Sequence, residues 1–313
     1  MTTELPISAA RANKPVPRRH LRQLTRRDRI VLGVMIGVPT LIQLVLVWLP
    51  TLASIILSFF KWDGLGLSGF HFNGLTNYNF VFNQAPQFWP AVLHNIVWLA
   101  FLGIIGTPLG LLLAVLLDSK IRGSRIYQTV FFLPVMLSLA LIGIIWQLMY
   151  SQDDGLINNV LGTAGTSGAI DWFGNSNVNL FAALIAATWR HAGYIMVLYL
   201  AGLKGVDPSL KEAASLDGAN GRQTFFRIVF PSMAATNIII VVITVIESLR
   251  AFDIVYVINH GTNGLELLSV LIVQYLVGET QVIGIGSAFA VVLLVISLVP
   301  IVIYLSRTFR NQE

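Results

Sequence analysis

Long apolar runs alternate with short polar segments along most of this chain. A helix needs about 20 predominantly apolar residues to cross a bilayer, and six runs are long enough. They predict spans at 30–60, 91–118, 127–150, 179–203, 231–258 and 283–306. The first run would measure about 46 Å as one helix against a hydrocarbon core of about 30 Å, so we expect it to tilt, protrude or break. The pattern indicates an all-α polytopic membrane protein with six transmembrane helices.

The composition supports a membrane protein and excludes an ordinary soluble domain. Of the 313 residues, 55% are hydrophobic and only 11% are charged, whereas about a quarter of a soluble domain is charged. The chain has no cysteine, which excludes disulfides and thiolate metal sites. Residues 1–28 are rich in Arg, Pro and Ala and are expected to form a disordered basic tail, followed by one transmembrane domain at 29–313.

The distribution of positive charge predicts the orientation of the spans. If the N-terminus is inside, 17 of the 20 Lys and Arg residues fall in the tail, the second-to-third connection, the fourth-to-fifth connection and the C-terminus. The loops on the other side contain only Lys61, and Arg190 and Arg250 lie within spans. Lys and Arg are enriched in cytoplasmic segments. Both termini are therefore expected to be cytoplasmic.

The polar segment 204–230, between the fourth and fifth spans, has the signals of a short, well-capped helix. Asp207 is a favourable N-cap and Pro208 suits the first helical position. Gly218 can adopt the left-handed conformation that ends a helix, and a second short helix is expected from Arg222 to Val229. Two interpretations follow from these signals alone: a contact surface for a soluble partner, or a surface helix that only joins two spans.

The residues of this loop follow a recognisable pattern: E-A-A, two residues, D-G-A, then F, I and P downstream. Here it is formed by Glu212, Ala213, Ala214, Asp217, Gly218, Ala219, Phe226, Ile228 and Pro231. The loop resembles the EAA loop of binding-protein-dependent ABC importer permeases. Other segments resemble the carbohydrate-type branch of that family, with likeness to the maltose-type or glycerol-phosphate-type first permease subunit; they include 74–78, 132–134, 201–203 and 252–253.

The resemblance implies a type I ABC importer permease in the bacterial plasma (inner) membrane, a multi-pass transport subunit that is not an enzyme. The implied coupling contacts to a cytoplasmic ATPase are made by Glu212, Ala213, Ala214, Asp217, Gly218 and Ala219. The implied partners are a second permease subunit in a heterodimer, two ATPase subunits, an extracytoplasmic solute-binding protein and the lipid bilayer, with no nucleic acid. The chain has no Gly-Lys dipeptide and hence no Walker A phosphate loop. No cofactor is therefore expected on this chain, and ATP and Mg would be used by the partner ATPase.

Several polar or aromatic residues within the spans are candidates for a solute path. A charge in the bilayer core is costly unless it is paired or hydrated, so these residues should face the protein interior or a cavity: Trp189, Arg190, His191, Tyr194, Glu247, Arg250 and Asp253. One interpretation is a polar lining for a sugar or oligosaccharide; glycerol phosphate or a related phosphodiester also stays open. The other is a structural ion pair, such as Arg190 with Glu247.

Two other classes of protein remain to be weighed. A self-sufficient secondary transporter would show paired halves with broken helices, and no such duplication is visible. A membrane-embedded enzyme would need a nucleophile–base set or a metal motif. The chain contains five histidines, none in H-x-x-x-H spacing. A permease subunit is the preferred prediction.

Overall fold

The computed structural model describes residues 25–64, 66, 69–119, 122–278 and 281–310. Most of the predicted basic tail, residues 1–24, lies outside the described residues. In chain order the elements are α1 (Arg26–Gln43), the π-helical segment η1 (Leu44–Trp48), α2 (Leu49–Leu57), β1 (Phe60–Lys61), β2 (His71–Phe72), α3 (Thr76–Asn79), η2 (Phe80–Gln84), α4 (Phe88–Phe101), η3 (Leu102–Gly106), α5 (Thr107–Asp118), α6 (Ser124–Met136), α7 (Leu139–Met149), α8 (Leu156–Val160), α9 (Asn179–Lys204), α10 (Pro208–Leu216), α11 (Gly221–Thr224), η4 (Phe225–Val229), α12 (Phe230–Ser232), α13 (Ala234–Leu249), α14 (Asp253–Asn259), α15 (Leu268–Val277) and α16 (Ile283–Arg310).

The chain forms two compact units, Met1–Thr51 and Leu52–Glu313. In the first unit, Thr25 caps α1 by a reciprocal pair of hydrogen bonds with Asp28. Pro39 lies within α1, and the π-helical segment η1 follows, so the long first run is not one regular α-helix.

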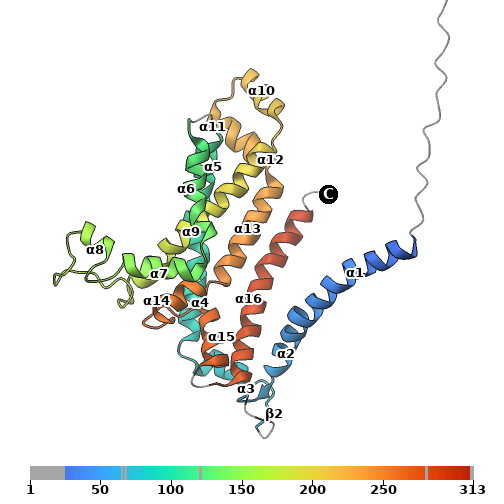
Figure 1. The fold of residues 1–313 in the computed structure, drawn as a ribbon, viewed down its shortest axis with the longest axis vertical. Helices are drawn as coiled ribbons and strands as arrows, with labels where there is room; N and C mark the ends of the chain where they lie inside the picture. Colours follow the sequence, from blue (N-terminus) through green and yellow to red (C-terminus); the bar gives the residue numbers. More distant parts are fainter. Residues whose placement is uncertain (1–24, 65, 67–68, 120–121, 279–280, 311–313) are drawn as a thin grey trace, which may run out of the picture. The chain divides into compact units, whose positions relative to one another are not determined.

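Helix α9 is the centre of the second unit and is buried over most of its length. It packs chiefly against α5 and α6 (Figure 1). The close approach to α5 requires Gly110, because a Cβ there would lie 2.7 Å from the Cβ of Ile195 and 2.9 Å from the carbonyl oxygen of Ala192. Small residues commonly allow membrane helices to approach in this way.

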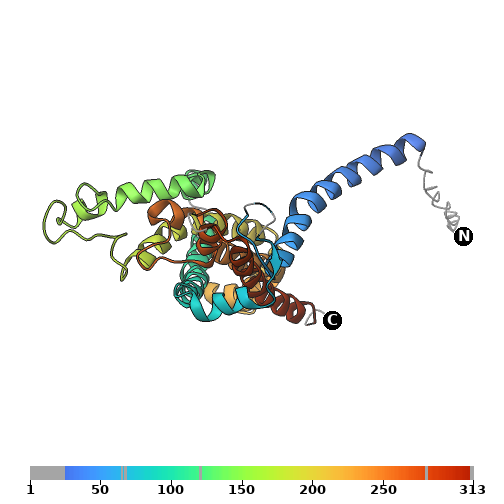
Figure 2. The same ribbon diagram turned by 90° about the horizontal axis from the view of Figure 1, so that it is seen from below.

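The two ends of this unit carry different structures. The short helices α10, α11 and α12 lie at one end, beyond α5, α6 and α13 (Figure 1). At the opposite end lie α3, α15 and a pair of antiparallel strands of two residues each, β1 and β2, in which Phe60 pairs with Phe72. The fold is therefore almost entirely helical rather than strictly all-α. Figure 2 shows α7 and α8 extending from the side of the helical bundle.

Two of the predicted spans are bent in the structure. Within the described residues, four helices are long and apolar enough to cross a membrane: Arg26–Leu57, Phe88–Asp118, Asn179–Lys204 and Ile283–Val302. The predicted span 127–150 is instead α6 and α7, which meet at 101°. The predicted span 231–258 is also interrupted: a 75° bend separates Gly221–Ser232 from the helices that follow. Six spans result only if each bent pair counts as one.

The bend between α6 and α7 has local causes. Leu137 is extended, and the Ser138 side chain accepts a hydrogen bond from the Leu141 N–H, so α7 begins with its own N-cap. Pro134 cannot supply a backbone N–H to α6. Hydrophobicity alone did not reveal these boundaries, nor did it predict α15, which follows a glycine-rich turn. The segment after α7 contains one further short helix, α8.

Candidate functional site

A break in the helical chain borders a cavity. Helix α13 ends at Leu249 and α14 begins at Asp253, so residues 250–252 are not helical. Beside them lies a cavity of about 190 Å³ whose polar lining comes from Arg190, His191, Glu247, Arg250 and Asp253. Non-helical backbone at membrane depth is tolerated where it is buried in protein or lines a water-filled cavity. The cavity therefore accounts for how the non-helical backbone at residues 250–252 is tolerated.

The break is held by side chains of α4 and α15. Asn95 Nδ2 donates to the carbonyl of Ser248 at 3.4 Å, and Asn95 Oδ1 accepts from the backbone N–H of Leu268 at 3.0 Å. The Ser269 hydroxyl donates to the carbonyl of Ala251. These bonds replace helical partners that the interruption removes, so the break is a defined feature of the fold.

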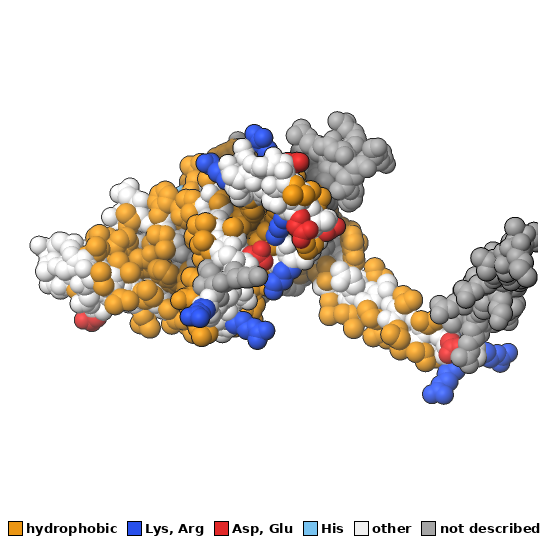
Figure 3. Space-filling model, turned by 90° about the horizontal axis from the view of Figure 1, so that it is seen from above, with side chains coloured by type: hydrophobic (Ala, Val, Ile, Leu, Met, Phe, Trp, Pro, Cys, Tyr) orange, Lys and Arg blue, Asp and Glu red, His pale blue; other side chains and the backbone are white. Residues whose placement is uncertain are grey.

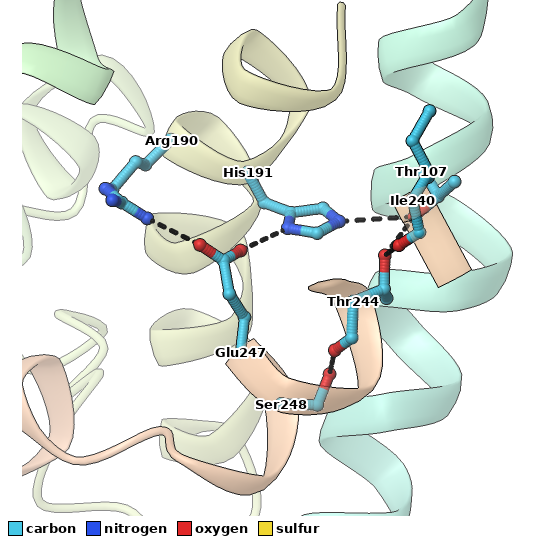
Figure 4. Close-up of polar contacts among 7 residues, drawn as sticks. All are labelled: Thr107, Arg190, His191, Ile240, Thr244, Glu247 and Ser248. Atoms are coloured by element: carbon cyan, nitrogen blue, oxygen red, sulfur yellow. Dashed lines mark hydrogen bonds and ion pairs between the residues drawn. The ribbon is translucent and has the colours of Figure 1, made fainter. Parts of the chain in front are cut away.

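The strongest polar contacts of the cavity converge on Glu247. Arg190 Nη1 donates to Glu247 Oε1 at 3.1 Å, and His191 Nδ1 lies 2.7 Å from Glu247 Oε2 (Figure 4). The ion pair considered from the sequence thus exists and joins α9 to α13. This ion pair is only partly buried, because 27% of the Glu247 side chain and 22% of the Arg190 side chain remain exposed. The buried Nε of Arg190 has no hydrogen-bond partner.

Arg250 and Asp253 sit at the two helix ends that the break creates. Arg250 is the C-cap of α13, and Asp253 is the first residue of α14. A cation is favourable at a helix C-terminus and an anion at an N-terminus, which gives each charge a structural role. Neither has an ion-pair partner within 4.0 Å among the described residues. Both also line a second cavity of about 360 Å³, toward α15 and α16.

Two of the predicted path residues do not line either cavity. Trp189 is 40% exposed, and its ring meets that of Trp146 edge-on at 6.0 Å. Tyr194 is half-buried and packs with the apolar cluster of α5 and α9.

The sequence analysis missed Asn95, Thr107 and Thr244, which hold the break and the His191 ring. Thr244 lies three residues before Glu247 on the same helical face, a spacing that could have drawn attention to it. Asn95 is a polar residue within an apolar span, which is also a usable signal. Among the described residues, no group of three or more His, Asp or Glu side chains could hold a metal ion.

Loop 204–230 forms the helix that its sequence predicts. The Asp207 side chain accepts from the Ser209 N–H at 2.9 Å and caps α10. This backbone hydrogen bond lowers the pKa of the Asp207 carboxyl below its usual value. Gly218 adopts φ +77° and ends the helix. A 3.9 Å contact between Lys211 Nζ and Asp118 Oδ2 links α10 to the end of α5.

The predicted coupling residues divide between two environments. Glu212, Ala213 and Asp217 are exposed, whereas Ala214 is 2% exposed and Ala219 is half-buried. Leu216, a large apolar side chain at the end of α10, is 88% exposed. Charged side chains gather at the end of the molecule that carries α10 (Figure 3). The outward face of α10 thus combines acidic and apolar groups.

Known proteins match this chain along most of its length. Residues 106–310 match the family model described as "Binding-protein-dependent transport system inner membrane component". The osmoprotective compounds uptake permease protein GgtC of Synechocystis sp. is 35% identical over 85% of this chain and 94% of its own. The xylose/arabinose import permease protein XacH of Haloferax volcanii is 32% identical over 93% of this chain and 92% of its own.

A solved structure has the same fold. A chain of the bacterial ABC transporter involved in the import of the acidic polysaccharide alginate superposes with a TM-score of 0.77 at 21% identity, covering 92% of this chain and 97% of that one. The family model alone covers more than half of the sequence. This chain belongs to the family of binding-protein-dependent transport system inner membrane components, the permease subunits of ABC importers.

Proposed function

We propose that this permease subunit forms part of the path by which an ABC importer carries a sugar, oligosaccharide or related polyhydroxylated solute across the inner membrane. The observation that carries the proposal is the cavity at the helix break, with unpaired Arg250 and Asp253 beside the partly exposed Arg190–Glu247 pair. Two guanidinium groups and two carboxylates balance in charge. Together they offer both donors and acceptors to hydroxyl groups.

The relatives favour this class of solute over a phosphate ester. One is named for osmoprotective compounds and another for xylose and arabinose. A phosphate group would pair with Arg250, but Asp253 and Glu247 line the same small cavity and would repel it. Glycerol phosphate and related phosphodiesters are therefore the less favoured alternative.

ATP hydrolysis by the partner subunit would be coupled to transport through loop 204–230. In this proposal α10 docks on a separate cytoplasmic ATPase that binds ATP and Mg, with Glu212 as the polar contact and Leu216 as an apolar anchor. The exposure of both side chains supports it. The assembly would contain a second permease subunit as a heterodimer, two ATPase subunits and an extracytoplasmic solute-binding protein. Both termini of this chain would then be cytoplasmic.

Uptake by variants of the cavity tests the solute path. We expect Arg250→Gln and Asp253→Asn to reduce uptake of labelled xylose, maltose or trehalose, whichever the wild-type importer takes up fastest. Asp154→Asn removes a carboxylate from segment 151–178 and serves as the matched control. Wild-type uptake in both cavity variants would contradict the assignment of these residues to the path.

A second experiment tests coupling. Glu212→Ala should leave the protein in the membrane but reduce both co-purification of the ATPase and uptake, whereas Asp154→Asn should change neither. Solute uptake in cells that lack the ATPase subunit would instead indicate a self-sufficient secondary transporter.

A further inference from the structure

The ring of His191 is held between a carboxylate and a hydroxyl group. His191 is 1% exposed, so water does not take the place of either contact. Its Nδ1 lies 2.7 Å from Glu247 Oε2, and its Nε2 lies 3.2 Å from the hydroxyl oxygen of Thr107 (Figure 4). These contacts connect three helices, because Thr107 begins α5, His191 lies on α9 and Glu247 lies on α13.

The chemistry of the carboxylate determines which groups in this arrangement donate hydrogen bonds and which accept them. An ionised carboxylate only accepts hydrogen bonds, so Nδ1 must be the ring nitrogen that donates to Glu247. In the neutral ring, Nε2 is then an acceptor and needs a donor. Thr107 is the one hydroxyl recorded within hydrogen-bond distance of it among the described residues. The hydrogen bond at one ring nitrogen sets the role of the other.

A second threonine competes for the proton of Thr107. The oxygens of Thr107 and Thr244 are 3.2 Å apart, and Thr244 donates its own proton to the carbonyl of Ile240 at 2.8 Å. Thr107 therefore has one proton and two acceptors, His191 Nε2 and Thr244 Oγ1. Removing the Thr244 hydroxyl would leave this proton to His191 alone.

We infer that Thr107 is a positioning residue of the importer: Glu247 keeps the ring proton of His191 on Nδ1, and Thr107, by donating to Nε2, fixes the orientation of the ring and so holds the Glu247 carboxylate at the cavity. The inference rests on the proposal that this cavity receives the solute. Loss of the Thr107 donor leaves Nε2 as a buried acceptor without a partner, and the ring can turn about its bond to Cβ. Nδ1 would then no longer be aimed at Glu247 Oε2.

The decisive measurement is the hydrogen bond between His191 Nδ1 and Glu247. Protein labelled with ¹⁵N-histidine, with the His191 signals assigned by their loss in His191→Gln, is compared as wild type, Thr107→Val, Thr107→Ser and Thr244→Val. We expect the Nδ1–H form throughout, with the Nδ1–H signal of the bond to Glu247 unchanged in Thr107→Ser and Thr244→Val and shifted toward that of a free N–H in Thr107→Val. A merely structural hydroxyl predicts equal effects of the two valine substitutions, and that result would overturn the inference.

Transport provides the second readout. For the sugar that wild type takes up fastest among xylose, maltose and trehalose, Thr107→Val should raise the half-saturating concentration about fivefold to tenfold, the size of one buried hydrogen bond. Thr107→Ser should restore it. Thr129→Val is the remote control, since among the described residues the Thr129 hydroxyl is bonded only to the Arg125 carbonyl of its own helix.

Including Glu247→Gln separates the two proposals. If Glu247→Gln lowers uptake while Thr107→Val changes neither the Nδ1–H signal nor uptake, the inference about Thr107 is wrong and the solute path stands. If Glu247→Gln transports like wild type, Glu247 does not meet the solute, and both the path assignment of Glu247 and the positioning role fail.

Discussion

Gly218 offers a substitution whose effect can be worked out from the backbone. It ends α10 with φ +77°, and no atom lies within 4 Å of the position that a Cβ would occupy. Its N–H donates to the Ser215 carbonyl at 3.2 Å, and the next N–H, of Ala219, donates to Ala214 at 3.0 Å. A Cβ at this position therefore meets no clash. The cost comes only from holding an L-residue in the left-handed conformation.

That cost differs among side chains in a known order. For an ordinary residue the left-handed conformation costs about 1–2 kcal/mol, and asparagine tolerates it better than alanine. A β-branched residue is the least tolerant. A loss of 1–2 kcal/mol lowers the ratio of native to rearranged loop by about five- to thirty-fold. We therefore expect the native loop to be populated in the order Gly218, Asn, Ala, Val.

Uptake and co-purification of the ATPase measure whether this conformation couples the subunits. Both should fall in the order given, while the amount of protein in the membrane stays constant. Gly221→Ala is the matched control, because Gly221 begins α11 without a positive φ and also has open space around it. Full uptake by Gly218→Val, or equal effects of alanine at the two glycines, would refute the reasoning.

Three further predictions concern other parts of the fold. Gly110→Ala should lower the thermal unfolding temperature in detergent, because its Cβ would lie 2.7 Å from that of Ile195 and overpacking costs about 1–3 kcal/mol; an unchanged midpoint would contradict the close contact. Asn158→Ala should expose segment 151–178 to proteases, since the fully buried Asn158 amide donates to the Ile170 carbonyl at 2.9 Å and each buried partner left unpaired costs about 1–3 kcal/mol; resistance like that of wild type would refute it. The depressed pKa of Asp207 means that its cap stabilises α10 above the unfolded value of about 3.9 and is lost as pH falls through the lower folded value; fluorescence of a probe on α10 should report this loss, and Asp207→Asn should abolish the pH dependence.

Helix α10 was predictable because all the signals that define it are local. Asp207 as N-cap, Pro208 at the first position and Gly218 at the end act within a few residues of one another, and the structure has α10 at Pro208–Leu216. Capping and left-handed termination need no tertiary partner. The same reasoning placed the helix expected from Arg222 to Val229, which appears as α11 and η4.

The helix break could not be predicted in this way, because its causes are distant in sequence. The segment around Arg250 contains neither proline nor glycine, and periodicity predicted a continuous span. The carbonyls freed at the break are bound by Asn95 on α4 and by Ser269, just inside α15. Only the fold brings these side chains to residues 248–251. Hydropathy reports which residues avoid water and contains no information about such contacts.

The charged residues in the fifth predicted span nevertheless indicated the position of the helix break. In a continuous helix, Glu247, Arg250 and Asp253 would have to be neutralised by neighbours, and within the described part of the chain only Glu247 has such neighbours. The break removes the difficulty for the other two, because it places Arg250 at a helix C-terminus and Asp253 at a helix N-terminus. It also opens the cavity that both line. Unpaired charges spaced three residues apart in an apolar run therefore indicate an interrupted helix, and the interruption is what makes a polar cavity possible inside the membrane.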